Sequence, residues 1–172
     1  MLQSFRDEFT RYRLIGERAL AQMSNEELNR VPSADGNSAA MIVRHISGNL
    51  VSRFTDFLTS DGEKPWRGRD EEFEYREYGR EEVDRRWADG WSVLEAELSR
   101  LEDADLAREV RIRDQAMPVH AALARSLAHA AYHVGQIVLL ARISAGGSWE
   151  WISIPKRRPG GDDAVPFREE QP

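Results

Sequence analysis

The 172-residue chain contains no cysteine. Disulfides, thiolate zinc sites, iron–sulfur clusters and a cysteine nucleophile are therefore excluded, and any metal ligand must come from His, Asp, Glu or water. Long apolar runs are also missing: none approaches the roughly 18 residues that cross a bilayer, and the N-terminus lacks the apolar core of a signal peptide. We therefore expect a cytoplasmic protein without a membrane partner.

A basic stripe is absent as well. The 24 Lys and Arg residues and the 30 Asp and Glu residues are mixed along the chain and give a net charge of −6. This balance disfavours a nucleic-acid partner. The length is that of one domain, which can bury a core without needing a metal in order to fold, so a bound metal is expected to be functional.

Apolar residues recur at three- or four-residue intervals in four long segments, which predicts four helices. The expected helices cover about residues 2–24, 38–59, 80–101 and 118–144. Residues 106–118 partly alternate apolar and charged side chains, which predicts a short extended or hairpin excursion before the last helix. The connection at 61–79 is charged and aromatic, and such loops often pack over a site.

These patterns predict an all-α fold, a four-helix bundle over residues 1–155, followed by an irregular C-terminal tail over 156–172 that is rich in Pro, Gly and charge. The inward faces of a bundle are where ligands from two helices can meet. Apolar and aromatic residues on more than one helical face also predict a homodimer.

Two histidines, His129 and His133, lie four residues apart in an apolar run. Residues at this spacing differ by only about 40° in direction on a helix, so both imidazoles can bind one divalent ion. His45 interrupts a comparable apolar stretch on the second expected helix and is the candidate third ligand. Three imidazoles leave a coordination position open for water or substrate, as in catalytic sites. The alternative is that the histidines are core or interface residues satisfied by hydrogen bonds.

Further polar residues are candidates for orienting the ligands or holding a small-molecule substrate. Asn49 and Arg53 fall on one helical stripe with His45, and Gln136 lies about one turn beyond His133. For the two amides, ordinary hydrogen bonding within the helix or the core is an equal alternative.

Arg125 lies four residues before His129 on the same stripe. It can meet an anionic substrate, although an ion pair with a neighbouring carboxylate is the simpler expectation. Ala130 follows His129, so the His-Glu-x-x-His pattern of zinc proteases with its glutamate base is missing. Peptide hydrolysis of that kind is disfavoured.

The segment Arg125-Ser-Leu-Ala-His-Ala-Ala-Tyr-His-Val-Gly-Gln-Ile, with a single histidine on the second expected helix, resembles the DinB superfamily of DinB/YfiT-like metalloproteins. The stretches 45–64 and 67–73 resemble one branch of it, the DUF1572 family. The resemblance implies a right-handed up-down-down-up four-helix bundle, often dimeric. It also implies that His45, His129 and His133 bind a divalent metal ion, zinc or nickel first, with iron and manganese as alternatives.

Characterised members of the superfamily include S-transferases and isomerases that use a low-molecular-weight thiol, namely bacillithiol, mycothiol or glutathione. Three functions stay open for this chain. One is a metal-dependent thiol S-transferase, in which the ion holds a thiolate that attacks an electrophile. The second is a metal-dependent hydrolase that uses metal-bound hydroxide. The third is a non-catalytic, stress-associated binding or dimerisation module, which is considered because no nearby Asp or Glu can be named as a general base. The S-transferase is the leading hypothesis.

Overall fold

The computed structural model describes residues 1–153, which form five α-helices and one two-stranded antiparallel sheet. The elements are α1 (Leu2–Leu20), α2 (Asn25–Asn29), α3 (Ala39–Phe54), α4 (Arg80–Arg100), β1 (Glu109–Ile112), β2 (Gln115–Pro118) and α5 (Val119–Ala145), with 3-10 turns η1 (Asp70–Phe73), η2 (Asp103–Ala107) and η3 (Gly146–Ser148). The expected tail at 156–172 lies outside the described residues. Within residues 1–153, no helix combines the length and the apolar character that spanning a membrane requires.

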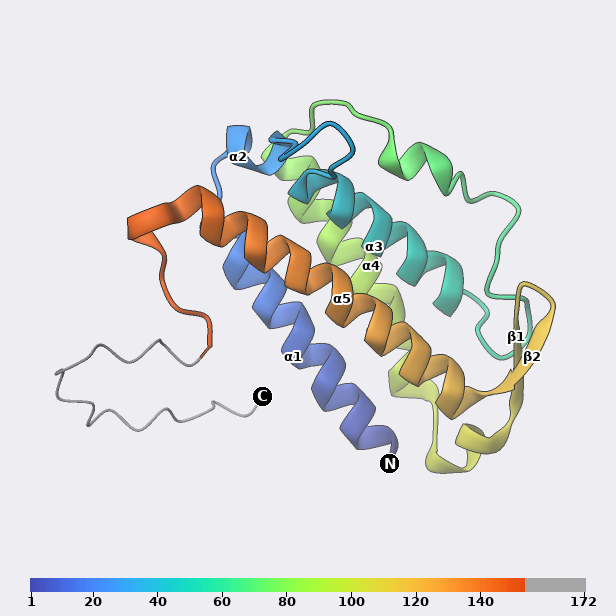
Figure 1. The fold of residues 1–172 in the computed structure, drawn as a ribbon. Helices are drawn as coiled ribbons and strands as arrows, with labels where there is room; N and C mark the ends of the chain where they lie inside the picture. The colour runs from blue at the N-terminus through green and yellow to red at the C-terminus, as the bar shows by residue number, and fades with distance from the viewer. Residues whose placement is uncertain (154–172) are drawn as a thin grey trace, which may run out of the picture.

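The four long helices α1, α3, α4 and α5 lie side by side (Figure 1). Helices α1 and α5 run in one direction, and α3 and α4 run in the opposite direction (Figure 1). The closest pairs are α1 with α5 and α3 with α4, while α3 also packs against α5. The fold is therefore mostly helical, as predicted, and the small sheet occupies the segment in which the sequence predicts an extended excursion.

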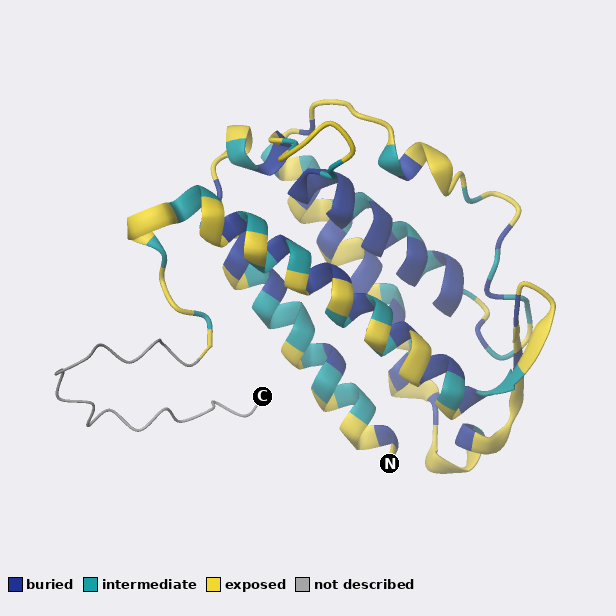
Figure 2. Cartoon of the chain, in the orientation of Figure 1, coloured by how far each residue is buried: buried dark blue, intermediate teal, exposed yellow. Residues whose placement is uncertain are grey.

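Helix α3 is buried along almost its whole length (Figure 2). Its neighbour α4 approaches it closely at Gly90, where a Cβ atom would lie only 2.7 Å from the Cα atom of Ser47. Aromatic rings fill the space between the helices: Phe9 of α1 meets Phe54 of α3 and Trp91 of α4 edge-on, with ring centroids 6.4 and 6.5 Å apart. This packing fixes α3 at the centre of the molecule.

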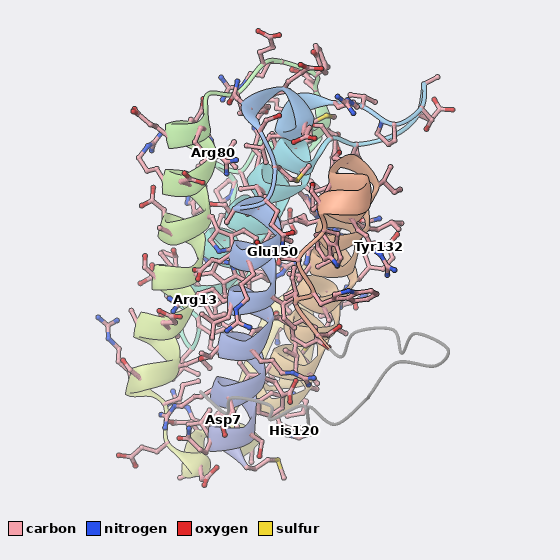
Figure 3. All side chains as sticks on the ribbon, turned by 90° about the vertical axis from the view of Figure 1, so that its left-hand side faces the viewer. Asp7, Arg13, Arg80, His120, Tyr132 and Glu150 are labelled. Carbon is pink, nitrogen blue, oxygen red and sulfur yellow. The ribbon has the colours of Figure 1, made fainter. Side chains whose placement is uncertain are left out.

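Charged side chains join α1 to α4 on the surface (Figure 3). Arg13 forms an ion pair of 3.0 Å with Glu95, and Arg80 donates a hydrogen bond of 3.1 Å to the carbonyl oxygen of Leu20. The second contact satisfies a carbonyl at the end of α1 that has no partner within its own helix.

Two helix ends differ from the sequence prediction. Helix α1 ends at Leu20 because Ser24 begins a separate short helix: its hydroxyl accepts from the Glu27 amide, and the Glu27 carboxylate accepts from the Ser24 amide. Helix α3 ends at Phe54 instead of near residue 59, and Asp56 follows with a φ of 51°. A residue in this left-handed region ends a helix.

The hairpin of β1 and β2 turns at Arg113 and Asp114, both with positive φ, 54° and 60°. A two-residue loop with this conformation is a type I′ turn, which glycine or asparagine usually occupies. Here Asp61, from the loop after α3, accepts hydrogen bonds from both turn amides, at 2.9 and 2.7 Å. The loop after α3 and the hairpin are thereby joined at one end of α3 and α5.

Candidate metal centre

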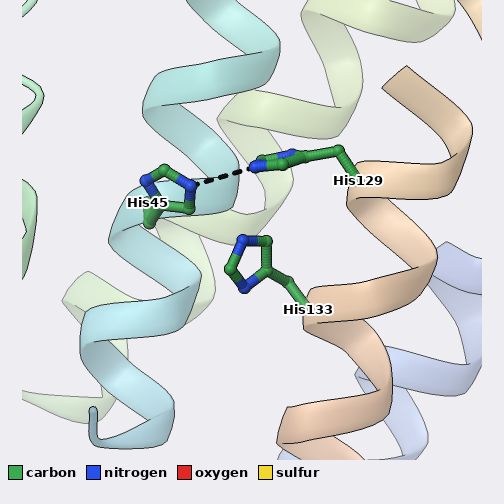
Figure 4. A group of neighbouring side chains, drawn as sticks. All are labelled: His45, His129 and His133. Carbon is green, nitrogen blue, oxygen red and sulfur yellow. Dashed lines mark hydrogen bonds between the residues drawn. The ribbon is translucent and has the colours of Figure 1, made fainter. Parts of the chain in front are cut away.

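Three histidines from two helices point toward one another (Figure 4). His45 comes from the middle of α3, and His129 and His133 come from successive turns of α5. One ring nitrogen from each lies within 4.8 Å of the other two, and the Nε2 atoms of His45 and His129 are 3.0 Å apart. His45 and His133 are buried and His129 is half-buried. The group can hold a metal ion.

Two of these rings are oriented by hydrogen bonds from their other nitrogen. The Nδ1 atom of His45 lies 2.8 Å from Glu72 Oε2, and that of His133 lies 2.8 Å from Gln136 Oε1. Both partners are acceptors, so Nδ1 is the protonated nitrogen in each ring and donates the bond. The Nε2 atom of His45 then accepts a hydrogen bond from Nε2 of His129, 3.0 Å away (Figure 4), and a bound ion would replace the proton between them. Donation from Nδ1 to an oxygen acceptor is the arrangement typical of metal-binding histidines.

Glu72 is itself held by Arg67, whose Nε and Nη2 atoms each lie 2.8 Å from one carboxylate oxygen. Burial alone would raise the pKa of Glu72, but the hydrogen bonds from His45 and Arg67 bring that pKa below its ordinary value. The carboxylate approaches α3 at Gly48, where a Cβ atom would lie 2.2 Å from Oε1. Glu72 is therefore an ionised partner of His45 and Arg67, with both oxygens occupied.

The histidines on α5 are kept neutral by their surroundings. Burial lowers the pKa of His129 to about 3, and the neighbouring His133, His45 and arginines act in the same direction. Burial also lowers the pKa of His133, opposed in part by its hydrogen bond with Gln136. Because only neutral imidazole binds a metal ion, these surroundings favour the ligating form at neutral pH.

A cavity of about 190 Å³ opens beside the histidines. It is lined by His45, Asn49, Arg53, Arg67, Arg69, Ile112, Arg113, Arg125, Ser126 and His129. Three of the polar candidates from the sequence, Asn49, Arg53 and Arg125, therefore lie at the cavity, while Gln136 contacts His133 instead. Contrary to the simpler expectation, Arg125 forms no ion pair with a carboxylate among residues 1–153.

Glu72, Arg67 and Arg113 were not predicted from the sequence as site residues. Their positions depend on how the 61–79 loop and the hairpin return to the helices, which no local periodicity reports. Two signals were present: the charge and aromatic content of the loop, and Gly48, a helix-interior glycine on the same helix as His45. Such a glycine often marks a close approach by another group.

A family model described as a protein of unknown function, DUF1572, matches residues 1–158. The chain belongs to the DUF1572 family. The match spans the three histidines, the loop that carries Glu72 and the whole lining of the cavity. No curated protein and no solved structure matches the chain.

The residues present in the DUF1572 chain fit a divalent cation. Neutral imidazoles suit zinc, nickel, copper and iron, and the absence of thiolate and carboxylate ligands argues against softer or harder ions. Two nitrogens bound to one tetrahedral zinc lie roughly 3.3 Å apart, from metal–nitrogen lengths of about 2.05 Å. That value lies between the 3.0 Å that separates the Nε2 atoms of His45 and His129 and the 4.8 Å within which all three ring nitrogens lie. Modest side-chain adjustments therefore suffice to bind one ion.

Proposed function

We propose that His45, His129 and His133 bind one divalent metal ion and that the protein is a metal-dependent thiol S-transferase. The observation that carries the proposal is the convergence of the three rings, two of them with Nδ1 already donating to an oxygen partner. Zinc or nickel is the first expectation for such a nitrogen set. Iron and manganese are the alternatives, and manganese fits less well because it prefers oxygen ligands.

We also propose that the helices form the up-down-down-up four-helix bundle of the DinB superfamily. The directions of α1, α3, α4 and α5 in Figure 1 support this assignment, as does the origin of the three histidines on α3 and α5. The superfamily relation in turn supports the choice of a low-molecular-weight thiol as cofactor.

When bound, the ion would lower the pKa of a thiol or water at its open position and make it a nucleophile at neutral pH. The protein's own groups set the rest of the chemistry. Glu72 and Gln136 hold two of the ligand rings in place, and the cavity beside the rings receives the substrate. The reaction then joins the thiolate sulfur to the electrophilic carbon, and the bond to the leaving group breaks with its electron pair.

The choice of thiol transfer over hydrolysis comes from the lining of the cavity, to which residues 1–153 contribute no carboxylate. The nearest buried carboxylate, Glu72, has both oxygens occupied by His45 and Arg67. The pKa of water is about 15.7 and that of a thiol is about 8.5, so a thiol beside a metal ion needs less help from a general base to lose its proton than water does. A site without a free base therefore suits the thiol better.

Product analysis tests this function. Zinc- or nickel-loaded protein is mixed with an alkylating electrophile, with and without bacillithiol or glutathione, and the thioether and the hydrolysis product are both measured. His129→Ala should abolish thioether formation, whereas His120→Ala should retain it, because His120 is exposed and its one hydrogen bond within residues 1–153 is to the Leu106 carbonyl oxygen. Hydrolysis without thiol would favour the hydrolase, and no turnover would favour the non-catalytic module.

We further propose a homodimer formed through α5. Three large apolar side chains on this helix are exposed, Tyr132 at 65%, Leu139 at 58% and Ile143 at 68%, and their spacing of seven and four residues places them on one stripe. Figure 3 shows Tyr132 on the outer side of α5. Light scattering should give twice the mass of the chain, and a monomer at high concentration would contradict the dimer. A cytoplasmic location remains a prediction from the sequence.

A further inference from the structure

The cavity beside the histidines is strongly basic although the protein as a whole carries a net charge of −6. Of the residues that the structure describes, five arginines line it, and no Asp or Glu does. They come from four separate segments of the chain: Arg53 from α3, Arg67 and Arg69 from the loop at 61–79, Arg113 from the hairpin turn and Arg125 from α5. Positive charge gathered in a hollow raises the local concentration of anions.

The carboxylates around the cavity do not balance these arginines. Glu63 is shared, at 3.5 Å from Arg53 and 3.0 Å from Arg113. Glu72 pairs with Arg67, and Asp70 pairs with Arg69 at 3.1 Å. Arg125 has no ion pair or hydrogen bond within residues 1–153. Asp61 also interacts with Arg53, so four carboxylates of residues 1–153 face five guanidinium groups.

Arg53 is buried but only partly paired. It is only 7% exposed, its Nη1 atom is buried without a hydrogen-bond partner in the described part of the chain, and its Nη2 atom lies 3.5 Å from Glu63. A charge-assisted hydrogen bond is shorter, about 2.7–2.9 Å. Burial, followed by the charges of Arg67, Arg113 and Arg125, lowers the pKa of Arg53, and only Glu63 opposes them. A buried guanidinium of this kind is costly without a further anionic partner.

Two more buried polar side chains line the same cavity. Asn49 is 8% exposed and Ser126 is 6% exposed, and neither side chain has a hydrogen bond within residues 1–153. Their polar atoms are not fully enclosed, so they are open to a ligand in the cavity. Both groups can donate to an oxygen, so their chemistry matches that of the arginines around them.

We propose that this cavity binds the oxyanion group, a carboxylate or a phosphate, of the small ligand that the protein acts on. At about 190 Å³ the cavity takes the anionic end of a ligand and not a whole cofactor. His45 and His129 line the same hollow, so a ligand held by Arg53 and Arg125 extends toward the proposed metal. The inference gives the substrate class of the proposed function, and it rests on that function for the end of the ligand that reaches the metal. The anion site itself needs no metal.

Titration calorimetry at low ionic strength tests the anion site with two probes, inorganic phosphate and succinate, on chelator-treated protein. We expect at least one probe to bind with a stoichiometry of one, and the stronger probe identifies the oxyanion. Arg125→Gln should weaken binding about tenfold or more, the loss expected for one charge-assisted contact. Arg125 is exposed and unpaired within residues 1–153, so this variant should keep its fold.

Arg53→Gln should lower the affinity for the same probe by at least the same factor, and circular dichroism checks that this variant folds. The matched control is Arg85→Gln on α4, whose side chain is 64% exposed, pairs only with Asp89 and does not line the cavity. Equal weakening in the control would show general charge attraction and would overturn the proposal. So would the failure of both probes to bind either metal-free or zinc-loaded wild type. If the protein binds the probes but no metal, the proposed metal site is refuted and the anion site is supported.

Discussion

Replacing Glu72 by glutamine perturbs the contacts that orient His45. The carboxylate accepts a hydrogen bond from His45 Nδ1 at 2.8 Å and two from Arg67, each also at 2.8 Å. Glu72 is only 5% exposed. Glutamine keeps one acceptor oxygen but turns an NH2 group toward one of the donors. One charge-assisted hydrogen bond is then lost, which costs roughly 1.5–3 kcal/mol of folding stability. Loss of a group that orients a metal ligand lowers metal affinity about 10- to 100-fold.

The assay is a zinc titration against a competing chelator, with urea denaturation of the metal-free protein measured in parallel. Glu71→Gln is the matched control because Glu71 is the adjacent residue of η1 and its side chain is exposed. We expect the affinity to fall in Glu72→Gln and to stay within about twofold of wild type in Glu71→Gln. Unchanged zinc affinity in a folded Glu72→Gln protein would refute the reasoning that Glu72 prepares His45 for metal binding.

Three further outcomes are expected. Gly48→Ala should lower zinc affinity, because its Cβ atom would lie 2.2 Å from Glu72 Oε1 and displace that carboxylate. Both substitutions then act through Glu72, so the double variant with Glu72→Gln should lose little more zinc affinity than either single variant. An additive loss would contradict this. Burial lowers the pKa of His129 to about 3 and also lowers that of His133, so only the unfolded chain gains these protons as pH falls below 6.5. The metal-free protein should lose up to about 1.4 kcal/mol per histidine per pH unit below that point in urea melts, and a flat profile would argue against neutral buried rings. Asp61→Ala removes the acceptor of both hairpin-turn amides, at 2.9 and 2.7 Å, and should cost about 1–3 kcal/mol; a wild-type urea midpoint would show that the turn is stable alone.

The helices could be predicted from the sequence because an apolar repeat of three or four residues records which face is buried over many turns. The same repeat put His129 and His133 on one side of α5, and the apolar surroundings of His45 singled it out on α3. Helix ends were less accurate, since α3 stops at Phe54 where the chain enters a left-handed conformation at Asp56.

The surroundings of the histidines could not be predicted in this way. Glu72 reaches His45 from an irregular loop 27 positions away, and its path depends on tertiary contacts such as the close approach at Gly48. The basic cavity was hidden for a related reason. Charges that alternate in sign along the chain average to a mildly acidic surface, whereas the fold collects arginines from four separate segments around one hollow.

The most direct test of the central claim is elemental analysis of protein purified without an affinity tag. Zinc, nickel, iron and manganese are measured in wild type, His45→Ala and His133→Ala, with His120→Ala as the control on the exposed side of α5. The account predicts close to one metal ion per chain in wild type and His120→Ala, and loss of the metal in both other variants. A metal-free wild type that takes up none of these ions when they are added would contradict it.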